Sequence, residues 1–146
     1  MKSILRVLLM LSLGSVPAWA ALGGSVATVT ADVQAFNGQH QLFSKVGYNL
    51  HQITTRGGVV NEFVSSNGTV FGVSWQGQFH PDFRQLLGTH LTDLQSGQRI
   101  NAVGRRGVTI QNTDFVLVNV GHGHFFRGRA YIPSLVPANL TAEVVQ

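Results

Sequence analysis

The chain has 146 residues, with 10 Lys and Arg, 6 Asp and Glu, and no cysteine, a length typical of one domain. The absence of cysteine excludes disulfides, thiol nucleophiles and thiolate-bound zinc or iron–sulfur sites. Only 11% of residues are charged whereas 44% are hydrophobic, so the composition excludes an intrinsically disordered chain.

Residues 1–20 have the three parts of a secretory signal peptide. Lys2 and Arg6 form a basic start, and residues 7–16 form a short apolar run. Ala18-Trp19-Ala20 then provides a small-residue cleavage site. The apolar run is too short to cross a bilayer, which takes about 20 residues.

We therefore expect cleavage between Ala20 and Ala21, leaving residues 21–146 as a single α+β domain. Losing Lys2 and Arg6 lowers the net charge from +4 to +2, and the remaining basic residues are scattered, so we expect no nucleic-acid partner. No second long apolar stretch follows, so we expect no transmembrane anchor in the mature chain. The predicted location is the periplasm or the outside of the cell.

The first predicted element is a helix over residues 25–36, because its apolar residues repeat at helical spacing. Ser25 is the expected N-cap, and Asn37-Gly38 is a helix stop signal. The apolar stripe consists of Val26, Val29, Val33 and Phe36.

Three strands of an antiparallel meander are predicted next, from alternating apolar residues. They cover Val46–Thr54, Val59–Ser65 and Thr69–Gln76. Asn67-Gly68 indicates a two-residue hairpin loop with positive φ between the second and third strands.

A second helix is predicted over Asp82–Gln95. Asp82 and Gln85 have the spacing of a capping box, and the apolar stripe runs on from there at helical spacing. Gly88 falls inside this helix, which suggests close packing on the sheet, and Gly97 is the expected C-terminal cap. His90 lies on the apolar stripe, where a histidine is more often a core or rim residue than a catalytic base.

Three more strands are predicted over Val108–Asn112, Phe115–Val120 and His124–Ile132, with residues 133–146 as a C-terminal tail. The predicted fold class is α+β, with an antiparallel sheet of about six strands and two helices on one face, in the order α-βββ-α-βββ. The alternative is a closed six-stranded barrel.

Several segments resemble one known family. They include Glu62-Phe63-Val64-Ser65, Trp75-Gln76-Gly77, Pro81-Asp82-Phe83-Arg84-Gln85-Leu86-Leu87-Gly88 and the run from Gly128 to Pro137. The chain is similar over nearly its whole mature length to exported bacterial proteins grouped as domain of unknown function 2844. The resemblance implies an exported single-domain protein, mostly of Gram-negative bacteria, and assigns no activity and no catalytic residue.

His122 and His124 are the candidate metal ligands. Two histidines spaced by one residue on a strand point the same way, but a zinc site needs three or four protein ligands, so a polar turn is the competing interpretation. Glu62 is expected to face solvent or to form a structural ion pair with Arg84, in preference to a catalytic role.

Trp75, Phe79 and Arg84 are the candidate binding residues, because aromatic side chains at a strand end beside an arginine suit a peptide or a glycan. Packing beneath the second helix is the competing interpretation of the two aromatics. The sequence therefore predicts a non-enzymatic periplasmic or secreted binding or structural module, without cofactor, whose candidate partner is an envelope protein or a glycan. The alternative is a small envelope hydrolase or metal-dependent enzyme using His122 and His124.

Overall fold

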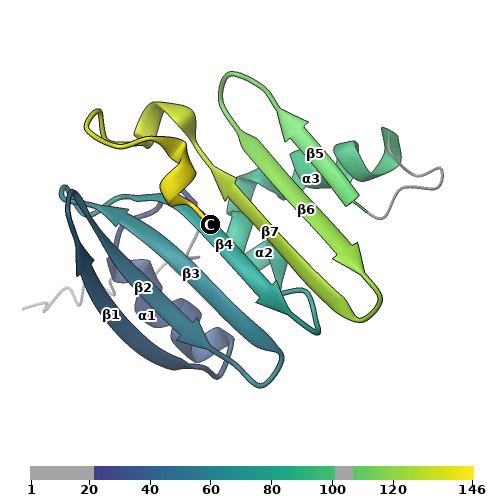
Figure 1. The fold of residues 1–146 in the computed structure, drawn as a ribbon, viewed down its shortest axis with the longest axis horizontal. Helices are drawn as coiled ribbons and strands as arrows, with labels where there is room; N and C mark the ends of the chain where they lie inside the picture. The colour runs from purple at the N-terminus through teal and green to yellow at the C-terminus, as the bar shows by residue number, and fades with distance from the viewer. Residues whose placement is uncertain (1–21, 101–106) are drawn as a thin grey trace, which may run out of the picture.

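The computed structural model describes residues 22–100 and 107–146 (Figure 1). Within them, seven strands form one antiparallel sheet in the order β1-β2-β3-β4-β7-β6-β5. The strands are β1 (Gln39–Lys45), β2 (Tyr48–Thr54), β3 (Gly58–Ser65), β4 (Val70–Gly77), β5 (Gly107–Gln111), β6 (Val116–His122) and β7 (Phe125–Tyr131). The predicted signal peptide and the cleavage site at Ala20 and Ala21 lie outside the described residues.

The helices cover one face of the sheet, and the C-terminal segment lies on the opposite face, which we call the open face (Figure 1). The helices are α1 (Ala27–Ala35), α2 (Phe83–Leu87) and α3 (Leu91–Ile100), with 3-10 turns η1 (Gly88–His90), η2 (Pro133–Leu135) and η3 (Ala142–Val144). The predicted α+β class with helices on one face is thus confirmed. The sheet has two free ends, β1 and β5, so the alternative of a closed barrel is wrong.

The main hydrophobic core lies between the helices and the sheet. Leu86 and Leu87 of α2 and Leu94 of α3 are almost fully buried against strand residues that include Val73 and Trp75. These leucines are the stripe that the sequence predicts, and short helices of this kind depend on such packing because they are marginal alone in water.

A second, smaller core lies on the open face. Phe63 and Phe71 pack there against Val145, which is fully buried although it belongs to the predicted tail. Tyr48 and Tyr131 extend the same cluster. The C-terminal segment is therefore a structural part of the domain.

The sheet has one strand more than predicted. β1 was not expected, because Gln39–Lys45 is mostly polar, its two apolar residues are adjacent and every residue is exposed, so no alternating pattern marks it. It forms because it pairs with β2 along its whole length across a turn in which Gly47 has a φ of 87°. With the additional strand, and with two short helices between β4 and β5, the element order is α-ββββ-αα-βββ.

The predicted helix over Asp82–Gln95 is interrupted at Gly88. This glycine has a φ of 54° and a ψ of −120°, outside the helical region, so it breaks the helix into α2 and α3. Gly97 is not a cap, since α3 continues to Ile100. Asp82 is the N-cap as predicted, with its Oδ1 accepting a 2.8 Å hydrogen bond from the backbone N–H of Arg84.

The hairpin between β3 and β4 has a three-residue loop instead of the predicted two. Gly68 has the expected positive φ, at 83°, and its N–H donates to the carbonyl of Ser65 at 2.9 Å. Among the described residues, Asn37 at the end of α1 is the one residue other than glycine with a positive φ. Asn67 therefore lacks the positive φ of a type I′ turn, and the loop matches the common three-residue form with a left-handed glycine.

Candidate functional site

A row of polar side chains crosses the middle of the open face. Gln52 on β2 donates from Nε2 to Oδ1 of Asn61 on β3 at 3.1 Å, and Asn61 donates from Nδ2 to Oγ of Ser74 on β4 at 3.2 Å. Ser74 is paired in register with Arg129 on β7. Residues opposite one another in an antiparallel pair share a face, so the row continues to this arginine.

The C-terminal segment is bound to this row through its main-chain oxygens. Ser74 donates from Oγ to the main-chain oxygen of Gln146 at 2.6 Å, and Arg129 donates from Nη1 to that of Val145 at 3.2 Å. Gly72 makes room for the segment, because a Cβ there would lie 2.6 Å from Cγ2 of Val145. The polar row thus already holds acceptor oxygens of one peptide segment.

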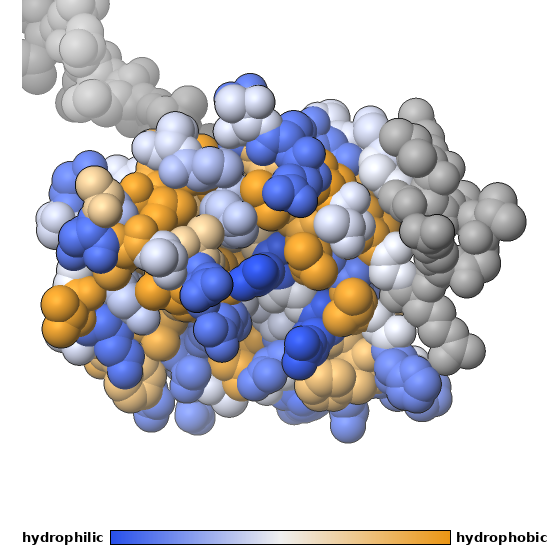
Figure 2. Space-filling model, turned by 45° about the horizontal axis from the view of Figure 1, so that its top comes forward, coloured by the Kyte–Doolittle hydropathy of each residue, from blue (hydrophilic) through white to orange (hydrophobic). Residues whose placement is uncertain are grey.

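A groove of about 570 Å³ lies beside the bound segment. Its described lining consists of Asn61, Ser74, Trp75, Gln76, Val118, Val120, Arg127, Gly128, Arg129 and Gln146, with two arginines and no carboxylate side chain. The side chain of Arg127 makes no hydrogen bond or ion pair with the residues that the structure describes. Figure 2 shows strongly hydrophilic side chains across the middle of the molecule in this view, with hydrophobic ones on both sides. The groove therefore offers positive charge next to apolar surface.

A pair of buried carboxyl groups lies on the other face, beneath α1. Asp32 on α1 and Glu62 on β3 are each 1% exposed and hydrogen-bond one another. Gln85 on α2 donates from Nε2 to Oδ1 of Asp32 at 2.6 Å. Burial, followed by the neighbouring carboxyl, raises the pKa of Glu62 to about 9, and burial also raises the pKa of Asp32.

This pair corrects the expected environment of Glu62, which neither faces solvent nor pairs with Arg84. Arg84 is exposed on α2, and the partner of Glu62 is Asp32. The sequence carried a signal for the burial of Glu62. It lies two residues from both Val60 and Val64, a spacing that places all three side chains on the same face of β3. Because both carboxyls are sealed under a helix, we assign the pair a structural role.

The structure brings two of the three predicted binding residues, Trp75 and Phe79, to one hollow. Trp75 is 3% exposed; its Nε1 donates to Oδ1 of Asn119 at 3.2 Å, and its ring lies 5.1 Å from that of Phe83. Trp75 and Phe79 both line a small hollow of about 170 Å³, and Arg84 is not among its lining residues. Phe79 is 71% exposed.

The candidate metal ligands His122 and His124 lie at the exposed turn between β6 and β7. Within residues 22–100 and 107–146, no group of three or more His, Asp or Glu side chains is placed to hold a metal ion. Metal binding by this histidine pair, and the enzymatic alternative built on it, stay predictions that the metal content of the purified protein would test.

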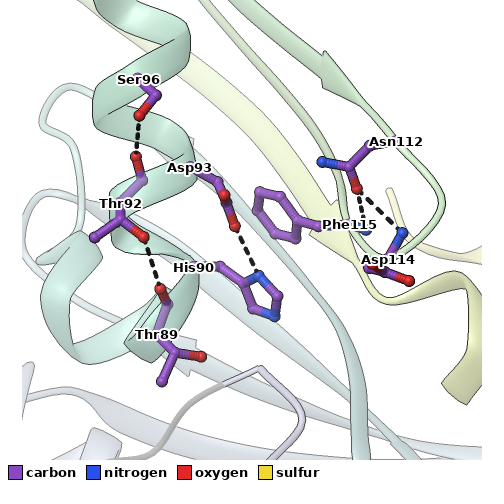
Figure 3. A network of polar contacts seen from close by, with 8 residues as sticks. All are labelled: Thr89, His90, Thr92, Asp93, Ser96, Asn112, Asp114 and Phe115. Atoms are coloured by element: carbon purple, nitrogen blue, oxygen red, sulfur yellow. Dashed lines mark hydrogen bonds and ion pairs between the residues drawn. The ribbon is translucent and has the colours of Figure 1, made fainter.

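His90 is a rim residue, as the sequence suggests. Its ring stacks on that of Phe115 with centroids 4.4 Å apart and planes inclined by 6°. Its Nδ1 lies 3.0 Å from Oδ2 of Asp93, which follows in the first turn of α3 (Figure 3). Close by, Asn112 Oδ1 accepts from the backbone N–H groups of Asp114 and Phe115 and so orders the β5–β6 turn (Figure 3). The stacking of His90 on Phe115 thus joins the helical segment around α3 to the turn before β6.

The fold and its groove define a small α+β protein in which an open antiparallel sheet carries a basic cavity on the face away from its helices. The chain belongs to the family described as protein of unknown function (DUF2844), whose model matches residues 18–145. Comparison with curated proteins and with solved structures finds no match. None of the described helices combines the length and the apolar character needed to cross a membrane.

Proposed function

We propose that this protein is an exported, non-enzymatic binding module that holds an anionic ligand in the groove of the open face. The observation that carries the proposal is the pair of arginines, Arg127 and Arg129, which enter a groove whose described lining contains no acidic side chain. The signal-peptide pattern of residues 1–20 supports export, to the periplasm or out of the cell.

The two arginines suit a carboxylate or a phosphate. They alternate along β7 and so project from the same face of the sheet, and a guanidinium presents a fork of donors that matches either group. Arg129 is half-buried and already donates to a main-chain oxygen, whereas Arg127 is exposed and has no described partner. Arg127 is therefore the residue that we assign to the ligand's charged group.

The rest of the groove suits a ligand with a peptide-like or apolar body. Val118 and Val120 line the groove beside the arginines, and Val120 is 42% exposed. Asn61 and Gln76 add amide donors and acceptors. Ser74 and Arg129, two lining residues of the groove, already donate to backbone oxygens of the C-terminal segment, which supports a peptide as the ligand, and the arginines favour acidic side chains on it.

Fluorescence anisotropy with a labelled oligoglutamate peptide tests the proposal, with an oligoglutamine peptide of equal length as the uncharged probe. Arg127→Gln should weaken oligoglutamate binding by about 10- to 100-fold, the equivalent of about 1.5–3 kcal/mol for a hydrogen bond to a charged group. Arg84→Gln removes the same charge from the helix face and should leave the affinity unchanged. Equal weakening by both variants, or equal binding of both peptides, would contradict a site in the groove.

A further inference from the structure

β1 leaves one edge of the sheet open. All seven of its residues are exposed, and it pairs with β2 without interruption from Gln39 opposite Thr54 to Lys45 opposite Tyr48. None of the described residues pairs with its other edge. Backbone N–H and C=O groups along that edge therefore lack partners within the described part of the chain, which makes the edge a template for another strand.

This edge has little of the protection that isolated sheet edges carry. β1 contains no proline and no bulge, and its one charged residue is Lys45 at its end, whose Nζ lies 5.8 Å from the centre of the Phe43 ring. The opposite edge strand β5 is shorter, with five residues, and α3 packs on its face, where a Cβ on Gly97 would lie 2.9 Å from Cδ1 of Ile110. Of the two edges, β1 therefore offers the longer run of backbone groups to an added strand.

Apolar side chains reach this edge on both faces of the sheet. Leu42 is 54% exposed. It lies opposite His51 of β2, which in turn lies opposite Glu62 of β3, so Leu42 is on the face of the sheet that the helices cover. Phe43 is 38% exposed and lies opposite Leu50, a member of the small core on the open face. A strand added to β1 would continue the sheet and cover both side chains.

The sequence of β1 fits a second copy of itself. In an antiparallel arrangement centred on Leu42, Gln39 faces Lys45, Gln41 faces Phe43, and the two Leu42 side chains meet at the axis. This is the one antiparallel register that pairs all seven residues, and it sets no like charges opposite one another, which would be destabilising. A two-fold arrangement of this kind is also the commonest form of self-association.

We propose that two copies of this protein associate through their β1 strands, paired antiparallel about Leu42, so that the two sheets become one. The contact is independent of the groove on the open face, so the proposed ligand binding and this pairing can each fail without the other.

Sedimentation analysis of the purified protein tests the pairing by charge reversal at the axis. The unmodified chain should sediment as a dimer. Leu42→Lys alone and Leu42→Glu alone each place like charges face to face and should sediment as monomers, with a mass half that of the unmodified protein. An equimolar mixture of the two variants should recover the dimer, which also shows that both variants are folded. Phe125→Lys changes a comparably exposed apolar residue away from β1 and should stay dimeric.

Cross-linking gives a second measurement. Cα atoms directly opposite in an antiparallel pair are about 4.5–5.5 Å apart, within the range that a disulfide spans. Because the chain has no cysteine, Leu42→Cys should form a covalent dimer on mild oxidation, whereas Gln78→Cys in the exposed loop after β4 should remain a monomer. An unmodified chain that is monomeric throughout, a mixture of charge variants that stays monomeric, or assembly into open-ended polymers would each overturn the proposal.

Discussion

Replacing Glu62 by glutamine should stabilise the protein by an amount that grows with pH. Glu62 and Asp32 are almost fully buried and share a hydrogen bond, and the pKa of Glu62 is raised from 4.5 to about 9. Between these values the folded chain retains a proton that the unfolded chain has released. The contribution of Glu62 to stability is therefore complete below about pH 4.5 and is lost progressively as the pH rises toward 9.

The size of the stabilisation by glutamine follows from the difference between the folded and unfolded pKa values of Glu62. Each pH unit above the unfolded pKa costs somewhat over 1 kcal/mol, so holding Glu62 protonated at pH 7 costs about 3 kcal/mol. Glutamine has nearly the same shape, and its amide donates to Asp32 without titrating. Glu62→Gln should therefore raise the free energy of unfolding by up to about 3 kcal/mol at pH 7 and by almost nothing near pH 4.5.

Urea unfolding of both proteins at a series of pH values measures this difference. The buried His51 lies opposite Glu62, and burial lowers the pKa of this histidine; its own pH dependence is present in both proteins and cancels from the comparison. Glu143→Gln, at an exposed carboxyl of η3, is the matched control and should show no such trend. A Glu62→Gln effect that is constant with pH would refute the shared-proton description.

Three further outcomes are expected. Leu87→Ala should lower the free energy of unfolding by about 2–5 kcal/mol, because Leu87 is fully buried, whereas the exposed Thr92→Ala should change it by less than about 0.5 kcal/mol; equal effects in urea unfolding would contradict the docking of α2 on the sheet. Gly68→Val should cost about 1 kcal/mol or more, since Gly68 has a φ of 83°, and an unchanged urea midpoint would count against the turn. The exported protein should begin at Ala21, which N-terminal sequencing checks; an intact Met1 would show that the leader is not removed.

The elements that alternate or repeat clearly were predictable from sequence. β3 and β4 follow from residues that alternate across a half-buried surface, and the buried stripe of α2 and α3 from helical spacing, because in both cases one face must be apolar. Asp82 was predicted as the N-cap because an aspartate just before an apolar helical stripe can accept hydrogen bonds from the first free backbone N–H groups of the helix. The prediction of one unbroken helix in this region was wrong. Gly88 was assigned to close packing, whereas its backbone leaves the helical conformation and ends α2.

The features that the sequence did not predict depend on partners that are distant along the chain. β1 is polar and exposed and takes its conformation from β2, so no local pattern predicts it. The buried partner of Glu62 comes from α1, and Arg127 joins Arg129 and Asn61 in a groove only after β7 has paired with β4. The basic groove could not be found by searching for charge clusters along the chain, because the fold creates the cluster.

The pairing of β4 with β7 has a consequence for how the chain folds. The β1–β4 meander and the β5–β7 meander are each made of strands that follow one another, but Gly72 of β4 meets Tyr131 of β7 across a long stretch of chain. Local hairpins form quickly, whereas long-range pairings must first overcome the entropy of closing a large loop. Until β7 pairs with it, β4 is an edge strand that carries the apolar side chains of Val73 and Trp75. We therefore expect the pairing of β4 with β7 to be the slow step of folding, and the open edge of β4 to favour aggregation until that pairing is complete.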